Sequence, residues 1–325
     1  MKTKQRVLEL LESRRGKAVS GEELAGLIGV SRNAVWKAIE ELRKDGSTIL
    51  ARPKRGYFLP DYDNSLSAEG IRALTGDIPL KIDVRQSVTS TNDLLKEIAH
   101  KGEPEGYALI AAEQTAGKGR LGRQFYSPKG SGVYISLLLR PDMKAEQSLC
   151  ITTSAAVCVC KAIEKVSDGK LSPKIKWVND IYLNQKKVCG ILTEAAVSFE
   201  SGQLDYAVLG IGINIFTPQG DFPEDIKPVA SSLFGQTEQA NIRNRLTAAV
   251  LSELYKRLMQ DKTMDYLDEY RSYSMLDGRS VMVIKGDKRT PARVIGIDDS
   301  ARLIVKYEDG TEAALSSGEV SVKPR

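Results

Sequence analysis

The chain has 325 residues, of which 42% are hydrophobic and 27% are charged, and its formal net charge is +5. This length exceeds one ordinary compact core, so we expect two or three domains. No apolar run is long enough for a transmembrane helix, and the basic start lacks the apolar stretch of a signal peptide, so we expect a cytoplasmic protein without membrane contact. The single histidine, His100, excludes multi-histidine metal sites and, unless it is itself the base, histidine-assisted nucleophiles.

The four cysteines, Cys150, Cys158, Cys160 and Cys189, fit a reduced protein. None has C-x-x-C spacing, and three lie in or beside one apolar helical pattern. We therefore expect buried structural thiols in a reducing compartment.

The basic excess lies in the first 60 residues, which hold 13 lysines and arginines against 7 aspartates and glutamates. Their net charge is +6, and the remaining residues sum to −1. Charge alone does not separate a nucleic-acid surface from a solvated face, so the pattern within this segment decides.

Three short helices are predicted within this basic segment. Apolar residues at three-to-four spacing over positions 7–11 indicate the first helix. Ser20, with Glu23 three residues later, starts the second, and Ser31 caps the third after a turn at Gly29. Two short helices joined by a glycine turn are typical of a helix-turn-helix, whose second helix enters the major groove. The expected buried stripe of the third helix is Val35, Ile39 and Leu42.

A basic hairpin is predicted between residues 47 and 59, with Lys54 and Arg55 at its tip. Such a tip suits phosphate contact, so the segment is interpreted as the wing of a winged helix-turn-helix. A small helical protein-interaction module is the alternative. Trp36 lies with Arg32, Asn33, Lys37 and Glu40 on the face of the third helix opposite its buried stripe. It is either a core residue or a surface contact, and we expect it to pack in the core. The candidate DNA-contacting residues are Ser31, Arg32, Asn33, Lys37, Lys54 and Arg55.

The region 63–273 mixes strand-like apolar runs with helical patterns. Strands are expected at 109–113, 132–139, 175–178, 188–194 and 206–215, and helices at 146–165 and 242–259. The order predicts an α/β mixed-sheet domain without the strict alternation of a doubly wound fold. The tail, 274–325, alternates short strands with turns, which predicts a small SH3-like β-barrel. With the winged helix-turn-helix at 1–62, the sequence predicts a multi-domain α+β protein.

A glycine-rich basic loop, from Gly117 to Gly122, carries the most specific chemical signal. It formally matches G-x-G-x-x-G, but a strand-like run follows it instead of the helix that a dinucleotide-binding turn needs. Lys118, Arg120 and Arg123 alternate with glycines that permit close backbone approach, so the loop suits an anion such as a phosphate. A solvated basic turn is the alternative.

Three further polar motifs lie in the same region. K-W-V-N-D ends in Asn179 and Asp180, and Lys187 follows; this lysine suits a carboxylate or phosphate oxygen, and Asp180 suits a nucleotide-bound metal. An ordinary hairpin with surface lysines is the alternative. G-I-G-I-N, at 210–214, ends an apolar strand and permits close approach of a ligand. S-T-N, at 90–92, is either a plain N-cap or a site for a polar head group.

In this order, the motifs S-T-N, Q-T-A-G-K-G-R-L-G-R, K-W-V-N-D, K-K-V-C-G-I-L-T-E and G-I-G-I-N closely resemble those of the biotin–protein ligase family. With the winged helix in front and the small barrel behind, the whole chain resembles the bifunctional members that also repress biotin genes. The resemblance implies biotin contacts from Ser90, Thr91, Asn92, Gln114, Gly117, Lys118, Gly119, Arg120, Lys187 and Gly190. It implies ATP or adenylate contacts from Arg120, Arg123, Phe125, Asn179, Asp180, Ile211, Gly212 and Asn214.

The resemblance also implies roles within this site. Lys118, Arg120 and Lys187 are the implied catalytic residues, and Asp180 is near the nucleotide and its Mg²⁺. Residues 217–232 match a loop that orders over the adenylate, and their composition independently suggests mobility. The chain departs from the family pattern at three positions, where Val178 replaces proline, Lys118 replaces arginine and Phe125 replaces tryptophan.

The implied reaction joins biotin and ATP into biotinyl-AMP, and then transfers biotin to a lysine of the biotin carboxyl carrier protein of acetyl-CoA carboxylase. Positioning of the substrates and stabilisation of charge are sufficient for such chemistry. This agrees with a sequence whose single histidine argues against a histidine-assisted nucleophile. The implied further partners are operator DNA and, with adenylate bound, a second copy of the chain. The alternatives are a lipoate–protein ligase and a transcription factor that senses biotin without ligating it.

Overall fold

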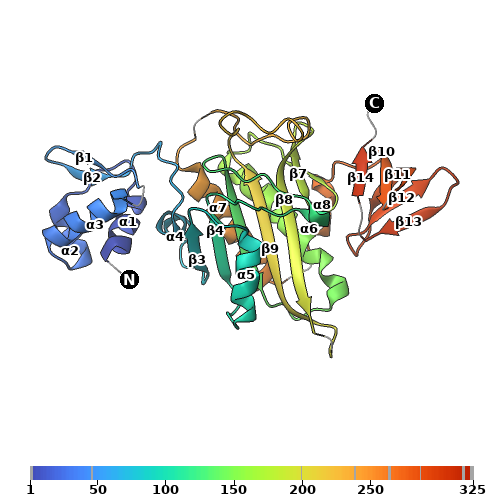
Figure 1. Cartoon of the computed structure of the whole chain (residues 1–325), viewed down its shortest axis with the longest axis horizontal. Coiled ribbons are helices and arrows are strands. Elements are labelled where there is room, and N and C mark those ends of the chain that lie inside the picture. Colours follow the sequence, from blue (N-terminus) through green and yellow to red (C-terminus); the bar gives the residue numbers. More distant parts are fainter. Residues whose placement is uncertain are drawn as a thin grey trace.

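A computed structural model describes residues 3–44, 47–198, 200–237, 239–262, 265–285, 287–316 and 319–322. Three parts follow one another along the long axis of the molecule (Figure 1): a small helical part, a central sheet with helices, and a small β part near the C-terminus. This arrangement confirms the multi-domain α+β prediction. Among the described residues, no helix is both long and apolar enough to cross a membrane.

The N-terminal part is a helix-turn-helix with a hairpin. It contains α1 (Thr3–Ser13), α2 (Gly21–Ile28), α3 (Arg32–Lys44), β1 (Leu50–Arg52) and β2 (Gly56–Phe58). Ser20 accepts a hydrogen bond from Glu23 N at 3.0 Å, and Ser31 accepts one from Ala34 N at 3.2 Å, so both predicted caps are confirmed. The part has a core of its own, made by residues that include Val7, Leu11, Leu24, Ile28, Val35, Ile39 and Leu42.

A buried arginine joins this part to the segment that follows it. The Arg15 guanidinium donates to Pro60 O at 2.8 Å and to Asp63 O at 3.1 Å. It also pairs with Glu12 at 2.7 Å, and the side chains of Arg15 and Glu12 are only 10% and 4% exposed. Burial raises the pKa of Glu12, although Arg15 opposes the shift. This buried ion pair and the two backbone contacts hold the chain in place where it leaves the N-terminal part for the central part.

The central part is built on a seven-stranded sheet in the order β3-β4-β5-β9-β8-β7-β6. Only β3 and β4 pair in parallel, so the sheet is mixed, as predicted. The strands are β3 (Lys81–Arg85), β4 (Tyr107–Ala111), β5 (Gly132–Leu139), β6 (Lys174–Lys176), β7 (Asp180–Leu183), β8 (Lys186–Val197) and β9 (Leu204–Asn214). The helices are α4 (Ala68–Thr75), α5 (Thr91–His100), α6 (Leu149–Val166), α7 (Ile242–Leu254) and α8 (Leu267–Tyr273), and a π-helical turn (Tyr255–Gln260) extends α7.

The two faces of this sheet have different coverings. Side chains alternate across a strand, and β5 is buried on both faces. Ile135 and Leu137 enter the large core that includes α6 and α7, whereas Leu138 packs with Leu95 of α5 on the other face. Because α5 is one short helix, it covers only part of its face, and the remainder holds a cavity described below.

The C-terminal part is a five-stranded antiparallel sheet, in agreement with the small β-domain that was predicted. Its strands are β10 (Ser280–Lys285), β11 (Lys288–Ile297), β12 (Leu303–Tyr307), β13 (Glu312–Leu315) and β14 (Glu319–Val322). The predicted strand 175–178 ends earlier, at Lys176, and the next two residues bond to parts of the chain distant in sequence. The Trp177 indole donates to Ala301 O at 2.9 Å, and Val178 O accepts from the Tyr270 hydroxyl at 3.0 Å.

Candidate active site and DNA-binding surface

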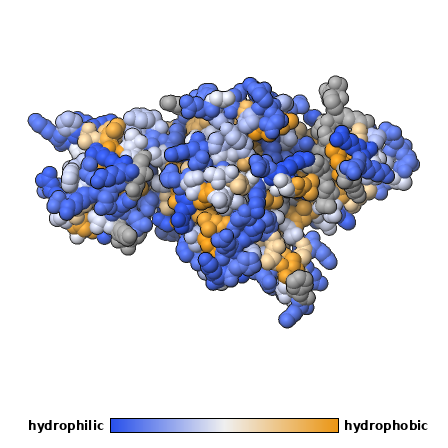
Figure 2. All heavy atoms as spheres, viewed as in Figure 1, coloured by the Kyte–Doolittle hydropathy of each residue, from blue (hydrophilic) through white to orange (hydrophobic). Residues whose placement is uncertain are grey.

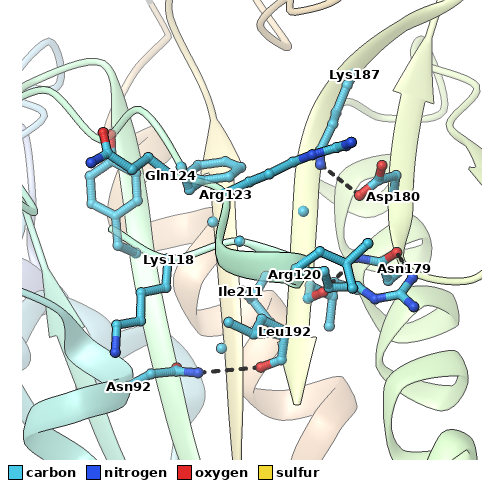
Figure 3. Close-up of a pocket in the computed structure, with 18 of the residues that line it drawn as sticks. Asn92, Lys118, Arg120, Arg123, Gln124, Asn179, Asp180, Lys187, Leu192 and Ile211 are labelled. Atoms are coloured by element: carbon cyan, nitrogen blue, oxygen red, sulfur yellow. Dashed lines mark hydrogen bonds and ion pairs between the residues drawn. The ribbon is translucent and has the colours of Figure 1, made fainter. Parts of the chain in front are cut away.

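A cavity of about 330 Å³ lies on the α5 face of the central sheet (Figure 3). The structure brings most of the predicted site residues to its walls, although they are spread over more than 120 positions of the sequence, from residue 90 to residue 212. The predicted residues that line it are Ser90, Thr91, Asn92, Gln114, Lys118, Gly119, Arg120, Arg123, Phe125, Asn179, Asp180, Lys187, Gly190, Ile211 and Gly212.

Two predicted residues lie behind the wall instead of on it. A Cβ at Gly117 would lie 2.5 Å from Phe125 O, so this glycine permits close packing of the loop. The Asn214 amide donates to Ser231 O at 3.0 Å. Both residues therefore support the site from outside the cavity.

One end of the cavity carries neutral hydrogen-bonding groups. Ser90 caps α5, which points the backbone of the S-T-N motif at the cavity. Gln114 Oε1 accepts from Thr91 N at 2.8 Å and from Thr91 Oγ1 at 3.0 Å. The buried Ser136 hydroxyl lies 2.8 Å from Thr91 Oγ1 and 2.6 Å from Asn92 Oδ1. This end suits a polar, uncharged head group.

A chain of charges connects this end to the glycine-rich loop. The Asn92 amide donates to Glu194 at 2.8 Å, and Lys96 pairs with Glu194 at 2.7 Å and with Asp93 at 2.9 Å. Lys118 of the loop also pairs with Asp93, at 2.6 Å. Partial burial raises the pKa of Asp93, but hydrogen bonds from Lys118 and Lys96 outweigh it, so the net shift is downward.

The opposite end of the cavity is lined by cations that have internal partners. Arg120 Nη1 donates to Asn179 Oδ1 at 3.0 Å, and Lys187 Nζ lies 2.6 Å from Asp180 Oδ1 (Figure 3). The distance between Lys187 Nζ and Asp180 Oδ1 is short enough for an ion pair. Among the described residues, however, no donor forms a hydrogen bond of suitable angle with Asp180 Oδ1. The close contact between Lys187 Nζ and Asp180 Oδ1 therefore pairs the two residues by charge. This end suits phosphate or carboxylate oxygens.

Three glycines form the floor between these two ends. A Cβ at Gly212 would lie 2.5 Å from the Phe125 ring, and one at Gly210 would lie 2.3 Å from Asn92 Oδ1. At Gly190 a Cβ would meet the Lys187 ammonium at 3.1 Å. Side chains at these positions would fill the space, which explains why the G-I-G-I-N and C-G-I-L motifs need glycine.

Residues 217–232 lie against the cation-lined end. Lys187 N donates to Val229 O, and Ser231 N donates to Lys187 O, each at 2.8 Å. The backbone of Lys187 is thus held on both sides by this segment. The mobility suggested by its composition stays a prediction.

Sequence reasoning gave no role to several residues that the structure places at the site. Asp93 and Glu194 hold the cations of the loop and of α5. Asp93 directly follows S-T-N, and Glu194 ends K-K-V-C-G-I-L-T-E, which was a usable signal. Trp177 and Ile284 also line the cavity, and Ile284 comes from the C-terminal part. Nothing in the local sequence of β10 indicates such a contact.

The candidate DNA-contacting residues form an exposed surface on α3 and the β1–β2 hairpin. Arg32, Lys37, Lys54 and Arg55 are all exposed, and among the described residues their side chains have no hydrogen bond or ion pair. Figure 2 shows a largely hydrophilic covering over this part, with small separate hydrophobic areas. The expectation that Trp36 packs in the core is wrong: it is 52% exposed, because Val35, Ile39 and Leu42 already fill the core side of α3.

Three family models match the chain. Residues 84–214 match the Biotin/lipoate A/B protein ligase family, residues 3–58 match an HTH domain, and residues 278–323 match the Biotin protein ligase C terminal domain.

Similar proteins extend over the same parts. The bifunctional ligase/repressor BirA of Bacillus spizizenii is 32% identical over 316 residues, which cover 96% of each chain. BirA of Escherichia coli is 30% identical and covers 95% of this chain and 94% of its own. The biotin protein ligase from Aquifex aeolicus, solved in complex with biotin and ATP, superimposes with a TM-score of 0.61 at 28% identity and covers 75% of this chain and 99% of that one.

The fold and the cavity therefore define a ligase of the biotin/lipoate type joined to a helix-turn-helix domain. The identity to the BirA proteins runs through all three parts of the chain. The chain belongs to the family of bifunctional biotin–protein ligases and repressors.

Proposed function

We propose that this chain joins biotin to ATP and transfers it to a lysine of the biotin carboxyl carrier protein of acetyl-CoA carboxylase. The observation that carries the proposal is one cavity with a neutral hydrogen-bonding end at Thr91 and Gln114 and a cationic end at Arg120 and Lys187. The first end matches the uncharged ureido head of biotin, and the second matches the carboxylate and phosphates that react. The proposed biotin and adenylate contacts are those named from the sequence.

In the proposed first step, a carboxylate oxygen of biotin attacks the α-phosphate of ATP, and pyrophosphate leaves with the electrons of the broken P–O bond. Lys187 and Arg120 hold the reacting oxygens, and Lys118 neutralises charge from the loop side. In the second step, the acceptor amine attacks the biotinyl carbonyl, AMP leaves, and the ammonium loses a proton. No protein nucleophile takes part.

Magnesium fits this site as an ion that accompanies ATP. Asp180 offers one carboxylate whose Oδ1 lacks a hydrogen bond among the described residues, and Mg²⁺ is ordinarily held by one or two carboxylates together with phosphates and waters. Asp180 would hold the ion, and Lys187 would then turn from Asp180 to the substrate oxygens. When bound, the ion supplies Lewis-acid stabilisation of charge on the phosphates.

Pyrophosphate release separates the proposed ligase from its alternatives. We expect release with biotin and ATP, and transfer of label to a carrier domain in a second step. Release with lipoate and ATP, but not with biotin and ATP, would indicate a lipoate–protein ligase. Biotin binding without any release would indicate a sensor that does not ligate.

We also propose that the helix-turn-helix represses biotin genes when the adenylate is bound, with two copies reading two half-sites. An adenylate that binds the dimer better than the monomer must favour dimers by the same coupling free energy, typically about 1–3 kcal/mol. Biotin plus ATP is therefore expected to tighten binding to operator DNA, and carrier protein is expected to reverse it. Sedimentation and DNA titration with and without biotinyl-AMP test this proposal. If the monomer–dimer constant and the DNA affinity are both unchanged, the proposed repressor function is contradicted.

The proposed domain boundaries, 1–62, 63–273 and 274–325, are tested by deletion. Removing residues 1–62 is expected to abolish DNA binding and to leave pyrophosphate release measurable, because the cavity lies entirely beyond that segment. Loss of release in a truncated chain shown to be folded would contradict separate modules. A moderate loss of biotin affinity would not, since Arg15 ties the two parts together.

A further inference from the structure

Trp36 is a large apolar side chain that the fold does not use. It is 52% exposed on α3, whereas its helix neighbours Val35 and Ile39 are fully buried. The core of the N-terminal part is complete without it. A tryptophan held half in water loses stabilisation that burial would provide, so this position is better explained by a contact made on binding than by folding.

The surroundings of Trp36 are polar and basic. Arg32, Asn33 and Lys37 are exposed and lie within one turn of it on the same helix. Residues of the first half of a recognition helix approach base edges, and Trp36 is the fifth of the 13 residues of α3. An exposed aromatic ring with Arg32 and Lys37 beside it suits an anionic partner that also offers apolar groups.

Duplex DNA has this chemistry. Its phosphates attract the cations, and its major groove presents one apolar group, the C5-methyl of thymine. A second copy of the chain fits poorly, because a two-fold contact through this face would bring two basic surfaces of like charge together.

We infer that Trp36 reads a thymine methyl group in the major groove and so contributes to the sequence preference of the repressor. The inference rests on the proposed DNA-binding function. The candidate DNA-contacting residues named from the sequence are all polar or charged, and the inference adds an aromatic residue that contributes to sequence specificity.

The test uses the full-length protein with biotin and ATP and a library of random-sequence duplexes, from which the wild type selects its preferred site. We expect Trp36→Ala to lose preference at one thymine position in each half-site and to keep it elsewhere. On the selected duplex, replacing that thymine with uracil removes only the methyl group. Wild-type affinity is then expected to fall about four-fold, the factor for about 0.8 kcal/mol per buried methyl-sized group.

The double-mutant cycle gives the decisive comparison. Trp36→Ala is expected to bind the thymine and uracil duplexes equally, and at least tenfold more weakly than wild type binds the thymine duplex. Trp36→Phe keeps an aromatic face and is expected to retain part of the discrimination. Leu74→Ala removes a side chain of similar exposure, 47%, from α4 of the ligase part, and is expected to change neither affinity nor discrimination.

The outcomes are separable. A wild type that selects no duplex contradicts the proposed DNA binding itself. A wild type that selects a site while Trp36→Ala shows the same uracil effect overturns the role of Trp36 and leaves DNA binding intact. A Trp36→Ala protein that binds each duplex normally but changes its monomer–dimer constant assigns the residue to a contact between copies, which also overturns the inference.

Discussion

The two ligand surfaces of this protein use their positive charges in opposite ways. In the ligase cavity, Lys118 is paired with Asp93, Lys187 with Asp180, and Arg120 is bonded to Asn179. On the DNA-binding surface, Lys37 and Arg55 are exposed and have no such partner among the described residues. A small ligand in the cavity must replace an internal partner, whereas DNA meets cations that are only solvated.

This difference predicts different kinds of selectivity. In the cavity, a ligand oxygen must take the place of an internal partner within hydrogen-bond distance of a cation. The cavity therefore discriminates ligands by their shape and by the position of their charge. Solvated cations attract phosphates regardless of sequence, and their contribution falls as salt rises. Four variants sharpen or break this comparison.

The largest effect is expected for Lys187→Ala. It removes a cation that we place on the reacting oxygens, and losses of such groups typically cost about 10²–10³-fold in kcat. Pyrophosphate release measures this. Lys186→Ala is the control, because the Lys186 ammonium donates to Lys227 O at 3.2 Å outside the cavity. Equal loss in both variants would refute a specific role, and thermal melting excludes unfolding caused by an unpaired Asp180.

Arg120→Ala is expected to release biotinyl-AMP about tenfold to a hundredfold faster. A charge-assisted contact to the phosphate is worth roughly 1.5–3 kcal/mol, and its loss lets the adenylate escape into water. Release is followed after mixing preformed complex with excess unlabelled biotin and ATP. Lys129→Ala removes an exposed cation just beyond the loop and is expected to behave as wild type. A variant that retained the adenylate normally would show that the loop is wrongly assigned.

The paired substitution Lys54→Ala with Arg55→Ala is expected to weaken DNA binding without changing sequence preference. Each lost phosphate contact reduces the slope of log affinity against log salt by about 0.9. Titrations at several salt concentrations measure this slope. Lys101→Ala on the ligase part removes one exposed cation and is expected to leave the slope unchanged. An unaltered slope in the double variant would mean that the hairpin does not reach the phosphates.

The smallest effect is expected for Asp93→Asn. We expect the ligand to draw Lys118 away from Asp93, with which it pairs in the structure, so neutralising Asp93 is expected to favour the bound state. Partly exposed ion pairs are worth about 0–1 kcal/mol, which corresponds to at most about fivefold tighter adenylate binding. Because the pKa of Asp93 is lowered, protonation reproduces this effect only at strongly acidic pH, and wild-type affinity has no such step near neutrality. If Asp93→Asn instead bound the adenylate more weakly, the ion pair between Lys118 and Asp93 would be shown to stabilise the ligand-bound loop.

The sequence predicted the parts of this molecule that depend on local signals. Capping at Ser20 and Ser31, the order of the three parts, and the mixed sheet all follow from short-range patterns, and the structure confirms them. The structure also brings most residues of the family-like motifs to one cavity, and their contacts with ligands stay predictions. These successes share a cause, since each residue is identified by its immediate neighbours.

What the sequence did not predict depends on long-range geometry. The Asn92 amide donates to Glu194, 102 residues away, and no local pattern indicates that contact. Trp36 was wrongly expected to be buried, because hydrophobicity was given more weight than the helix phase, which places it on the face opposite the buried stripe. The placement of Gly117 and Asn214 behind the cavity wall likewise depends on how β5, β9 and the loop pack together.

The contact between Trp177 and Ala301 has a consequence for how the enzyme is made. Ala301 and the cavity-lining Ile284 are synthesised after all the other residues that line the cavity, and domains generally fold in the order of their synthesis. The winged helix-turn-helix is therefore complete while the wall of the cavity is still unfinished. A nascent chain therefore has its DNA-binding surface before the wall of its cavity is complete, so catalytic competence requires that translation has passed Ala301.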